Sequence, residues 1–460
     1  MRCPHPLKTL VVATALALGA ADGASAATNA QLAELLEKLN QRVQALEQQQ
    51  SVLAQSLEQD TISEKEPDIT ARLKAVEVRT QGLAGSVGKL KALDGIKGGM
   101  NLSMVAQKSL DAHANDAQLS YRTDAFVSLP LESIGNTEQT VFAQVRLGQG
   151  AGLADLPSSY ANPNATFFQL NLGAQNSVAL LAQAWYQATI PLPLGGFKPA
   201  SRQKLEITVG KMDPFVFFDQ NAVAGDETRQ FLNSVFVHNP LLDAGGDMGV
   251  DANGFTPGLR VSLLDSTDRL ENWRVSLGLF GAGDKGSYYR GSLGAPLAML
   301  QAETQQRFFG GLLGNYRAYA WSNPQATPFA FDLPLAAPAL SAPERHNGWG
   351  LSMDQRVGDG MTLFARYGQQ AQGQVKFDRA LTVGAEANGS YWSRGGDSLG
   401  LALGWLRTVS EPERVAELFY RWRVAKQFEL TPSLQYIGSP GGDSAVPDVR
   451  IFSVRSQFTF

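Results

Sequence analysis

Cysteine is almost absent from this sequence: the one residue of its type, Cys3, is the third of 460. Such a chain has no disulfide framework and no cysteine-ligated metal site. Histidine is also scarce, and His5, His113, His238 and His346 show no ligand spacing. No nucleophile elbow, phosphate-binding loop or zinc motif is present. The sequence therefore nominates no catalytic group, no metal and no cofactor, and it disfavours an enzyme.

Long apolar runs and an excess of positive charge are missing as well. After the first 26 residues, no run approaches the roughly 20 apolar residues that a membrane-spanning helix needs. The 39 basic and 43 acidic residues give a net charge of -4. A nucleic-acid partner would leave a basic footprint, so none is expected.

The first 26 residues have the form of a secretory signal peptide. Arg2 and Lys8 are basic, the segment 10–21 is apolar, and Ala24, Ser25 and Ala26 supply a small-residue cleavage site. We expect cleavage before Ala27. The alternative, a transmembrane anchor, would need a longer apolar run. An exported chain without disulfides favours the Gram-negative envelope.

A heptad pattern follows the signal segment. Apolar residues recur with alternating spacings of four and three among Gln, Glu, Lys and Arg, as in a coiled coil. Glu66-Pro67 interrupts the helix, and the spacing resumes between Ile69 and Leu90. We predict a self-associating periplasmic coiled coil over residues 27–97; the alternative is an amphipathic helix folded onto its own domain. The first seam consists of Leu32, Leu36, Leu39, Val43, Leu46, Leu53 and Leu57, with Gln50 as its polar exception.

From about Gly98 the helical spacing gives way to alternation of apolar and polar residues. Successive side chains of a strand point to opposite faces, so this alternation predicts strands with one apolar and one polar face. About 16 such segments occur, each about 9–13 residues long, which is enough to cross a bilayer. Short connections alternate roughly with long ones, as in outer-membrane barrels. The segments begin near residues 100, 118, 140, 165, 179, 203, 257, 272, 307, 347, 361, 376, 397, 415, 428 and 449.

The last segment, "IFSVRSQFTF", ends the chain on an aromatic residue. Phe452, Val454, Phe458 and Phe460 share one face. In a bilayer every backbone polar group must be paired, so the last strand has to close against the first. The pattern predicts an all-β antiparallel outer-membrane barrel over residues 98–460.

The polar face of the segments carries charges of both signs, which would line a water-filled lumen. An anion pore should carry rings of Lys and Arg with few acids. Carboxylates that accept and guanidinium groups that donate instead suit sugar hydroxyls. For each arginine, the alternative is a salt bridge within the wall. The candidate pore-lining residues are Arg122, Asp124, Arg146, Arg260, Arg274, Arg317, Asp354, Arg356, Arg366, Glu417, Arg421, Arg423, Glu429 and Arg455.

One strand also offers aromatic rings on its polar face. The stretch "NYRAYAW" places Asn315, Arg317, Tyr319 and Trp321 on the same side. Polar groups beside aromatic rings form a plausible lining for a sugar, so Tyr319 and Trp321 join the candidate site.

The segment from Asp213 to Pro240 breaks the strand pattern. Long loops in compact folds are usually functional, and we predict that this one folds into the lumen and narrows the pore, with a short helix that begins near Asp226. The alternative is a cap outside the channel. Its candidate polar residues are Asp219, Asn221, Asp226, Glu227, Arg229 and Asn233.

Three stretches resemble the carbohydrate-selective porins of the OprB type. They are "FFDQNAVAGDETRQFLN" (217–233), "NGWGLSMDQRVGDGMTLFARYG" (347–368) and "ELFYRWRVAKQFELTPSLQYIGSPGG" (417–442). The resemblance covers roughly residues 100–460 and implies a 16-stranded barrel through which sugars diffuse into the periplasm. It assigns no single binding residue. The coiled-coil extension departs from the simplest family pattern and leaves the substrate class open.

Three functions remain open at this point. The favoured one is a passive carbohydrate porin in outer-membrane lipid, a homotrimer whose coiled coil holds the barrels together or contacts peptidoglycan. The second is a porin for anions or other small solutes. The third is a structural envelope protein anchored by its barrel.

Overall fold

The computed structural model describes residues 95–460 except 112–116, 151, 154–159, 167–175, 194–200, 245–253, 269–270, 284–292 and 330–341, together with Gln41 and Gln44. The chain divides into two units, Met1–Val87 and Gly88–Phe460. All the strands among the described residues belong to the second unit. The expected signal peptide lies outside the described residues. So does the predicted coiled-coil region 27–97, apart from the two helical glutamines and residues 95–97, of which Lys97 begins the first strand.

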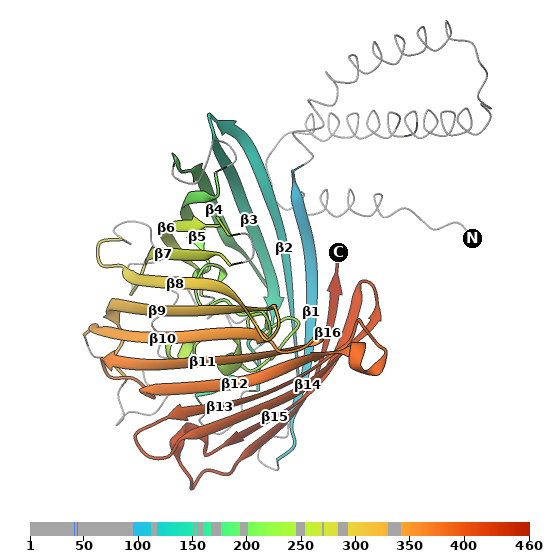
Figure 1. Ribbon diagram of the computed structural model, residues 1–460. Helices are drawn as coiled ribbons and strands as arrows, with labels where there is room; N and C mark the ends of the chain where they lie inside the picture. The colour runs from blue at the N-terminus through green and yellow to red at the C-terminus, as the bar shows by residue number, and fades with distance from the viewer. Residues whose placement is uncertain are drawn as a thin grey trace, which may run out of the picture. The chain divides into compact units, whose positions relative to one another are not determined.

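The described residues form sixteen antiparallel strands in one closed barrel (Figure 1). Each strand pairs with its neighbours in the sequence, and β1 pairs with β16. The strands are β1 (Lys97–Ser109), β2 (Ala117–Ile134), β3 (Thr137–Gln149), β4 (Val178–Pro191), β5 (Gln203–Met212), β6 (Thr256–Asp265), β7 (Trp273–Phe280), β8 (Leu297–Phe308), β9 (Leu312–Ala326), β10 (Glu344–Arg356), β11 (Met361–Gln372), β12 (Arg379–Asn388), β13 (Ser398–Arg407), β14 (Glu413–Ala425), β15 (Phe428–Gly438) and β16 (Val449–Thr459).

The predicted period of two is confirmed in the burial of the strands. In β13, buried and exposed residues alternate at every position, and the exposed ones include Leu399, Leu401 and Leu403. In β16, Phe452 faces outward while Ser453 and Arg455 are buried on the inner side. The barrel is thus apolar outside and largely polar inside, the reverse of a soluble sandwich.

Backbone pairing closes the barrel at the last residue of the chain. Asn101 lies opposite Thr459 in the β1–β16 ladder. The Met100 N–H donates to the Phe460 carboxylate at 3.1 Å, and the Phe460 N–H donates to the Met100 carbonyl at 2.8 Å. No strand edge is therefore left open along this seam.

The prediction of a strand near residue 165 was wrong. The described residues 160–166 form bends and turns, and β3 pairs directly with β4, which begins at Val178. The Asn162 carboxamide oxygen accepts from the Asn164 N–H, and that of Asn164 accepts from the Thr166 N–H and hydroxyl. Such local bonds satisfy the backbone in turns and compete with a ladder.

The segment predicted near residue 307 is two strands. β8 and β9 meet there in a tight turn in which Phe309, Gly310 and Gly311 all have positive φ. Glycine tolerates that conformation at no steric cost, which allows the hairpin to close. The strand number agrees with the prediction only because this missed hairpin offsets the false strand.

The two ends of the barrel differ in their connections. At the terminal end, where β1 begins and β16 ends, β2–β3 and β14–β15 are joined by two residues each, 135–136 and 426–427. At the opposite loop end, residues 213–255 join β5 to β6. Outside the strands lie the short helices η2 (Pro214–Val216), α4 (Ser234–Val237), α5 (Pro240–Ala244), η4 (Gly389–Trp392) and η5 (Pro440–Gly442). No helix among the described residues is long and apolar enough to cross a membrane.

Deletion of Phe460 tests the closure of the barrel. The deletion removes two backbone hydrogen bonds between the first and last strands, and we expect a loss of about 1–3 kcal/mol of folding free energy. Phe460→Ala keeps both bonds and serves as the control. Urea unfolding in detergent micelles gives both values; equal losses in the two variants would contradict a role for the backbone bonds.

Candidate functional site

The connection between β5 and β6 folds into the barrel. We call the segment 213–244 the inward loop. Inward-facing side chains of β2, β9, β11, β14, β15 and β16 all bond to it. A cap outside the channel could not reach so many strands, so the alternative placement of this segment is excluded.

The helix expected from Asp226 is not there. The Asp226 carbonyl accepts from the N–H groups of Arg229 and Gln230, which makes a single turn. The next N–H groups, of Leu232 and Asn233, donate to the buried Glu417 carboxylate on β14 at 2.9 Å each. That carboxylate draws the backbone away from a helical ladder, and α4 begins only at Ser234 with Asn233 as its N-cap.

A fully buried ion pair fixes the middle of the inward loop. Arg366 Nε of β11 lies 3.0 Å from Asp219 Oδ1, and both side chains have no exposed surface. The Asp219 carboxylate also accepts from the Tyr319 hydroxyl at 3.0 Å and the Asn239 N–H at 2.6 Å. Asp219 has a φ of +50°, a conformation that aspartate tolerates better than most residues. Removal of either charge would leave the other unpaired in a dry interior, which is costly.

Glycine in the wall makes room for this contact. A Cβ atom on Gly368 of β11 would lie 2.4 Å from the Asn239 side-chain oxygen, and one on Gly350 of β10 would lie 2.5 Å from the Tyr319 ring. Any larger residue at either position would push the inward loop off the strands.

Further ion pairs and hydrogen bonds hold the inward loop to the last strands. Arg229 makes a bidentate contact with Glu429 of β15, Nε at 3.0 Å and Nη2 at 2.5 Å. The pKa of Arg229 is raised, chiefly by this hydrogen bond. Arg455 of β16 donates to the carbonyls of Glu227 and Gln230 at 2.8 and 2.9 Å.

An apolar core joins the inward loop to the same side of the barrel. Phe231 packs on Phe236 and on the rings of Phe364 (β11) and Phe419 (β14), with centroids 5.0–5.6 Å apart. All four rings are at most 2% exposed. The inner face of β11–β16 is therefore filled by the loop.

Tyr319 and Trp321 belong to this filled side. They share the inner face of β9 as predicted, but they are 4% and 3% exposed. The Tyr319 hydroxyl is engaged by Asp219 and Asn239. Their rings support the inward loop and present no open face to a solute.

A charge cluster ties the inward loop to β2 and β3. Arg122 contacts both Asp124 and Glu227 at 2.7 Å, and Arg146 contacts Asp124 at 2.7 Å. Burial by itself would raise the pKa of Glu227, but Arg122 and Arg146 together hold it below its usual value. The sequence analysis had placed these three wall residues on the inward face without naming their partners.

Two loop residues beside this cluster have pKa values that are shifted in the direction that favours their neutral forms. Burial raises the pKa of Asp213 to about 6, although the carboxylate accepts the Phe215 N–H and caps η2. Burial lowers the pKa of His238 to about 3, and its ring stacks on Phe215 with centroids 3.6 Å apart.

A second set of charges crosses the wall opposite the filled side. We call it the charge ladder, because acids and arginines on six successive strands contact one another at 2.9–3.6 Å. Three acids and three arginines balance its net charge. Its members are Glu206 (β5), Arg260 (β6), Arg274 (β7), Glu303 (β8), Arg317 (β9) and Asp354 (β10).

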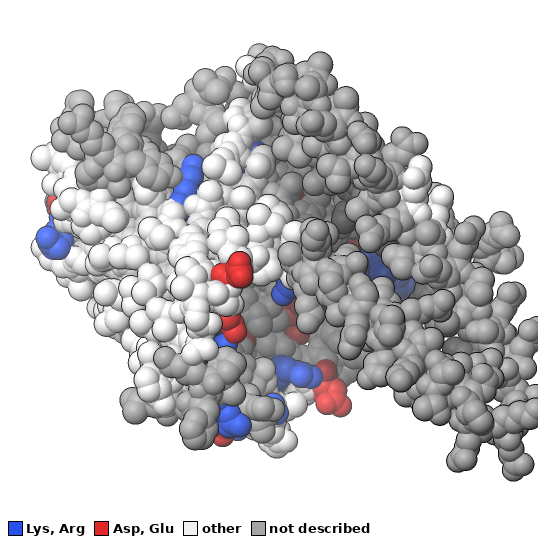
Figure 2. All heavy atoms as spheres, turned by 90° about the horizontal axis from the view of Figure 1, so that it is seen from above, with Lys and Arg blue, Asp and Glu red and all other residues white. Residues whose placement is uncertain are grey.

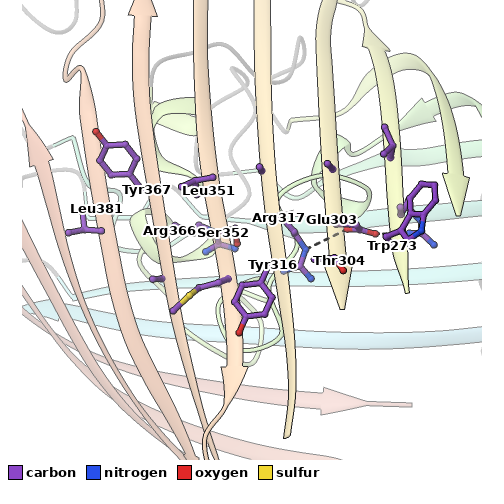
Figure 3. Close-up of a pocket in the computed structure, with 16 residues that line it drawn as sticks. Trp273, Glu303, Thr304, Tyr316, Arg317, Leu351, Ser352, Arg366, Tyr367 and Leu381 are labelled. Carbon is purple, nitrogen blue, oxygen red and sulfur yellow. Dashed lines mark ion pairs between the residues drawn. The ribbon is translucent and has the colours of Figure 1, made fainter. Parts of the chain in front are cut away.

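The middle of the charge ladder is the most accessible part. The side chains of Arg274 and Glu303 are 27% and 19% exposed, against 2% for Arg260 and 3% for Asp354. Arg274 Nε is itself buried and donates to no described protein atom. Arg260 is covered by the Phe217 ring, 4.9 Å from its guanidinium carbon. Figure 3 shows the Arg317–Glu303 pair in the wall.

The remaining predicted residues fall into two groups. Asn221 donates to the Met353 carbonyl at 3.1 Å, and Arg421 donates to Glu386 at 3.2 Å and to the Arg229 carbonyl, so both contribute to loop attachment. Arg356 and Arg423 are exposed at the terminal end and form no ion pair among the described residues. Eight of the eleven predicted arginines are thus in ion pairs, as the alternative interpretation had it; the other three, Arg356, Arg423 and Arg455, form none within the described part of the chain.

Glu206 and Glu303 were missed by the sequence analysis. Both face inward, and their strands carry the signal: Glu206 shares its face with the buried Thr208, and Glu303 shares its face with the buried Gln301. Glu303 was overlooked because the strand near 307 was placed too late. Figure 2, seen from above the view of Figure 1, shows acidic and basic side chains close together around a hollow.

Comparison with known proteins places the chain in a family. The model of the OprB family, described as carbohydrate-selective porin, matches residues 56–460. Pseudomonas putida OprB, in its high-pH structure, is 17% identical and has a TM-score of 0.65, over 81% of this chain and 96% of that chain. That likeness concerns the fold.

A triple mutant of Rhodopseudomonas blastica porin is 12% identical, over 79% of this chain and 100% of that chain. Its TM-score is 0.45, too low to support an argument. No curated protein matches the sequence. Because the family model spans most of the chain, including the whole barrel, the chain belongs to the OprB family of carbohydrate-selective porins.

Proposed function

We propose that carbohydrates diffuse passively through the barrel along a path between the inward loop and the charge ladder. The observation that carries this proposal is the asymmetry of the lumen. The inner face of β11–β16 is covered by apolar loop residues such as Phe231 and Phe236, both 0% exposed. The opposite wall keeps Arg274 and Glu303 partly exposed.

The chemistry of the charge ladder suits a neutral polyhydroxylated solute. Carboxylate oxygens accept from sugar hydroxyls, and guanidinium groups donate to sugar oxygens. The Arg274 side chain is 27% exposed and can present guanidinium N–H groups to the lumen. Acids and arginines are interspersed along the ladder, so it offers no continuous track to either cations or anions. A pore selective for anions would need a ring of arginines with few acids, so this second function is less well supported.

We propose that the barrel stands in the outer membrane with its N-terminus, and the segment 27–97, on the periplasmic side. The even number of strands puts both ends of the barrel domain on one face. The heptads between Leu32 and Leu57 support self-association, and we propose a homotrimer. Contact of this segment with peptidoglycan is a further hypothesis.

Single-channel recording tests the solute. The purified, refolded protein is inserted into a planar bilayer, and neutral sugars are titrated. Dose-dependent block by one class of sugar, with weak ion selectivity, is expected. Open channels that no sugar blocks would overturn the carbohydrate proposal, and a complete lack of channels would favour a structural anchor.

Substitutions in the charge ladder test the path. Glu303→Gln removes the negative charge that pairs with Arg274 and Arg317. The ratio of anion to cation permeability should therefore rise by roughly two-fold. Arg274→Gln should shift it toward cations by a similar factor. Reversal potentials in a salt gradient measure both. If neither variant differs from the native channel, the ladder does not line the path.

Arg366→Met tests the inward loop as the constriction. It leaves the Asp219 carboxylate buried without its counter-ion, which costs about 3–5 kcal/mol. The loop should detach from β11, so conductance should rise and sugar block weaken. Arg307→Met, at an exposed arginine of the terminal end, is the control. An unchanged conductance in a folded Arg366→Met channel would contradict the proposal.

Asp213 should make the folding stability of the protein depend on pH. Its pKa in the folded protein, about 6, is above the ordinary 3.8. Its stabilising contribution is therefore present below about pH 4 and is lost as the pH rises through 6. Asp213→Asn keeps the acceptor for the Phe215 N–H and should be more stable than the native protein by about 3 kcal/mol at pH 7, because each unit of pKa difference corresponds to about 1.4 kcal/mol, with almost no difference at pH 4. Urea unfolding at pH 4–7 measures this; a constant difference across the range would contradict the shifted pKa.

A further inference from the structure

Two arginines face each other on the outer surface at the loop end. Arg379, the first residue of β12, is directly opposite Arg407, the last residue of β13. Their side chains are 47% and 57% exposed. Both lie on the outward face, in line with Leu381 and Trp405. Like charges directly opposite in a sheet destabilise it, so an anionic partner would stabilise this pair.

The protein supplies little compensation for these charges. Asp378 lies between them but is 4.0 Å from Arg379 and 3.7 Å from Arg407, and it is 49% exposed. Arg414 of β14 adds a third exposed cation beside Trp405 and forms no ion pair among the described residues. Glu411 is the acid of the adjacent turn. Three cations thus face outward with a single carboxylate close to two of them.

Apolar residues lie directly below the arginines on the same face. Leu381 and Trp405 are paired across β12–β13 and are 41% and 38% exposed. Tyr367 lies opposite Leu381 on β11. Such a change from cations to aromatic and aliphatic groups over one pair of residues is typical of a membrane interface.

An apolar groove begins at this point. It has a volume of about 640 Å³ and crosses the outer face from β12 to β7 (Figure 3). Its floor includes the small residues Ala302, Ala318 and Ala365. Along its rim lie Leu381, Tyr367, Leu351, Tyr316 and Trp273.

We propose that this surface binds one phosphate-bearing lipid of the outer leaflet, its phosphate on Arg379 and Arg407 and an acyl chain in the groove. The proposal rests on the outer-membrane orientation given above and is independent of the solute in the lumen. Guanidinium groups bind phosphate through parallel N–H donors. The groove continues the same face directly below them, so one amphiphilic molecule satisfies both features.

A lipid fits the surface better than a second copy of the chain does. The groove lies within the wall that the bilayer covers, so acyl chains reach it without any protein interface. The cations require a complementary negative group, and the nearest exposed acids on this rim, Asp378 and Glu411, belong to the same patch. A second copy would bring the same excess of positive charge.

The test compares lipid A that carries both phosphates with its dephosphorylated form. Binding to the refolded protein in detergent is measured by native mass spectrometry. We expect the phosphorylated lipid to bind at least ten-fold more tightly, because arginines at a membrane surface attract anionic headgroups. In Arg379→Gln/Arg407→Gln this preference should be lost. Ala318→Phe, which fills the groove floor, should weaken binding of both lipids.

The matched control is Arg307→Gln/Lys426→Gln, which removes the same charge at the terminal end. It should bind phosphorylated lipid A as the native protein does. Equal affinity for the two lipids, an equal loss in the control, or displacement by inorganic phosphate alone would overturn the proposal. Dimers that dissociate in Arg379→Gln/Arg407→Gln would instead assign the surface to a second copy. Single-channel conductance shows that each variant is folded and separates this result from the test of the solute.

Discussion

The structure depends on the need to pair every backbone N–H and C=O group in a bilayer, where no water can replace a missing partner. This need closes β1 on β16 and extends the ladder to the terminal residue, whose N–H and carboxylate both bond to Met100. Once the ring is closed, the position of a residue along a strand decides whether it faces lipid or lumen. Leu401 faces outward and Arg455 faces inward because their side chains point to opposite sides of the barrel wall.

Inside the barrel, the position of the inward loop is set by charges that would be costly if unpaired. Asp219 and Arg366 are fully buried and satisfied by each other and by their neighbours. Buried ion pairs add little net stability, but they penalise any other arrangement. The loop is thereby held on the β11–β16 side, and the charge ladder on the other wall is left as the accessible polar surface.

The sequence predicted part of this site and missed part of it. Arg122, Asp124 and Arg146 were expected on neighbouring strands and do meet. Tyr319 was expected to line the lumen; parity placed it inside correctly but could not show that the loop would cover it. Glu303 was missed because strand boundaries are the least certain part of such a prediction. The strand was predicted to begin near residue 307, after Glu303, whereas β8 begins at Leu297.

Alternation, turn residues and the missing apolar helices determined the barrel and its two faces, because those properties follow from local periodicity and from the chemistry of the solvent. The tertiary structure alone decided which charges pair, since the partners are far apart in the chain: Arg366 is 147 residues from Asp219, and Arg229 is 200 from Glu429. It also decided that Arg379 meets Arg407 on the outer surface. Contacts of this kind depend on the register of the strands and on the course of a loop. The residue pattern of a single segment determines neither of them.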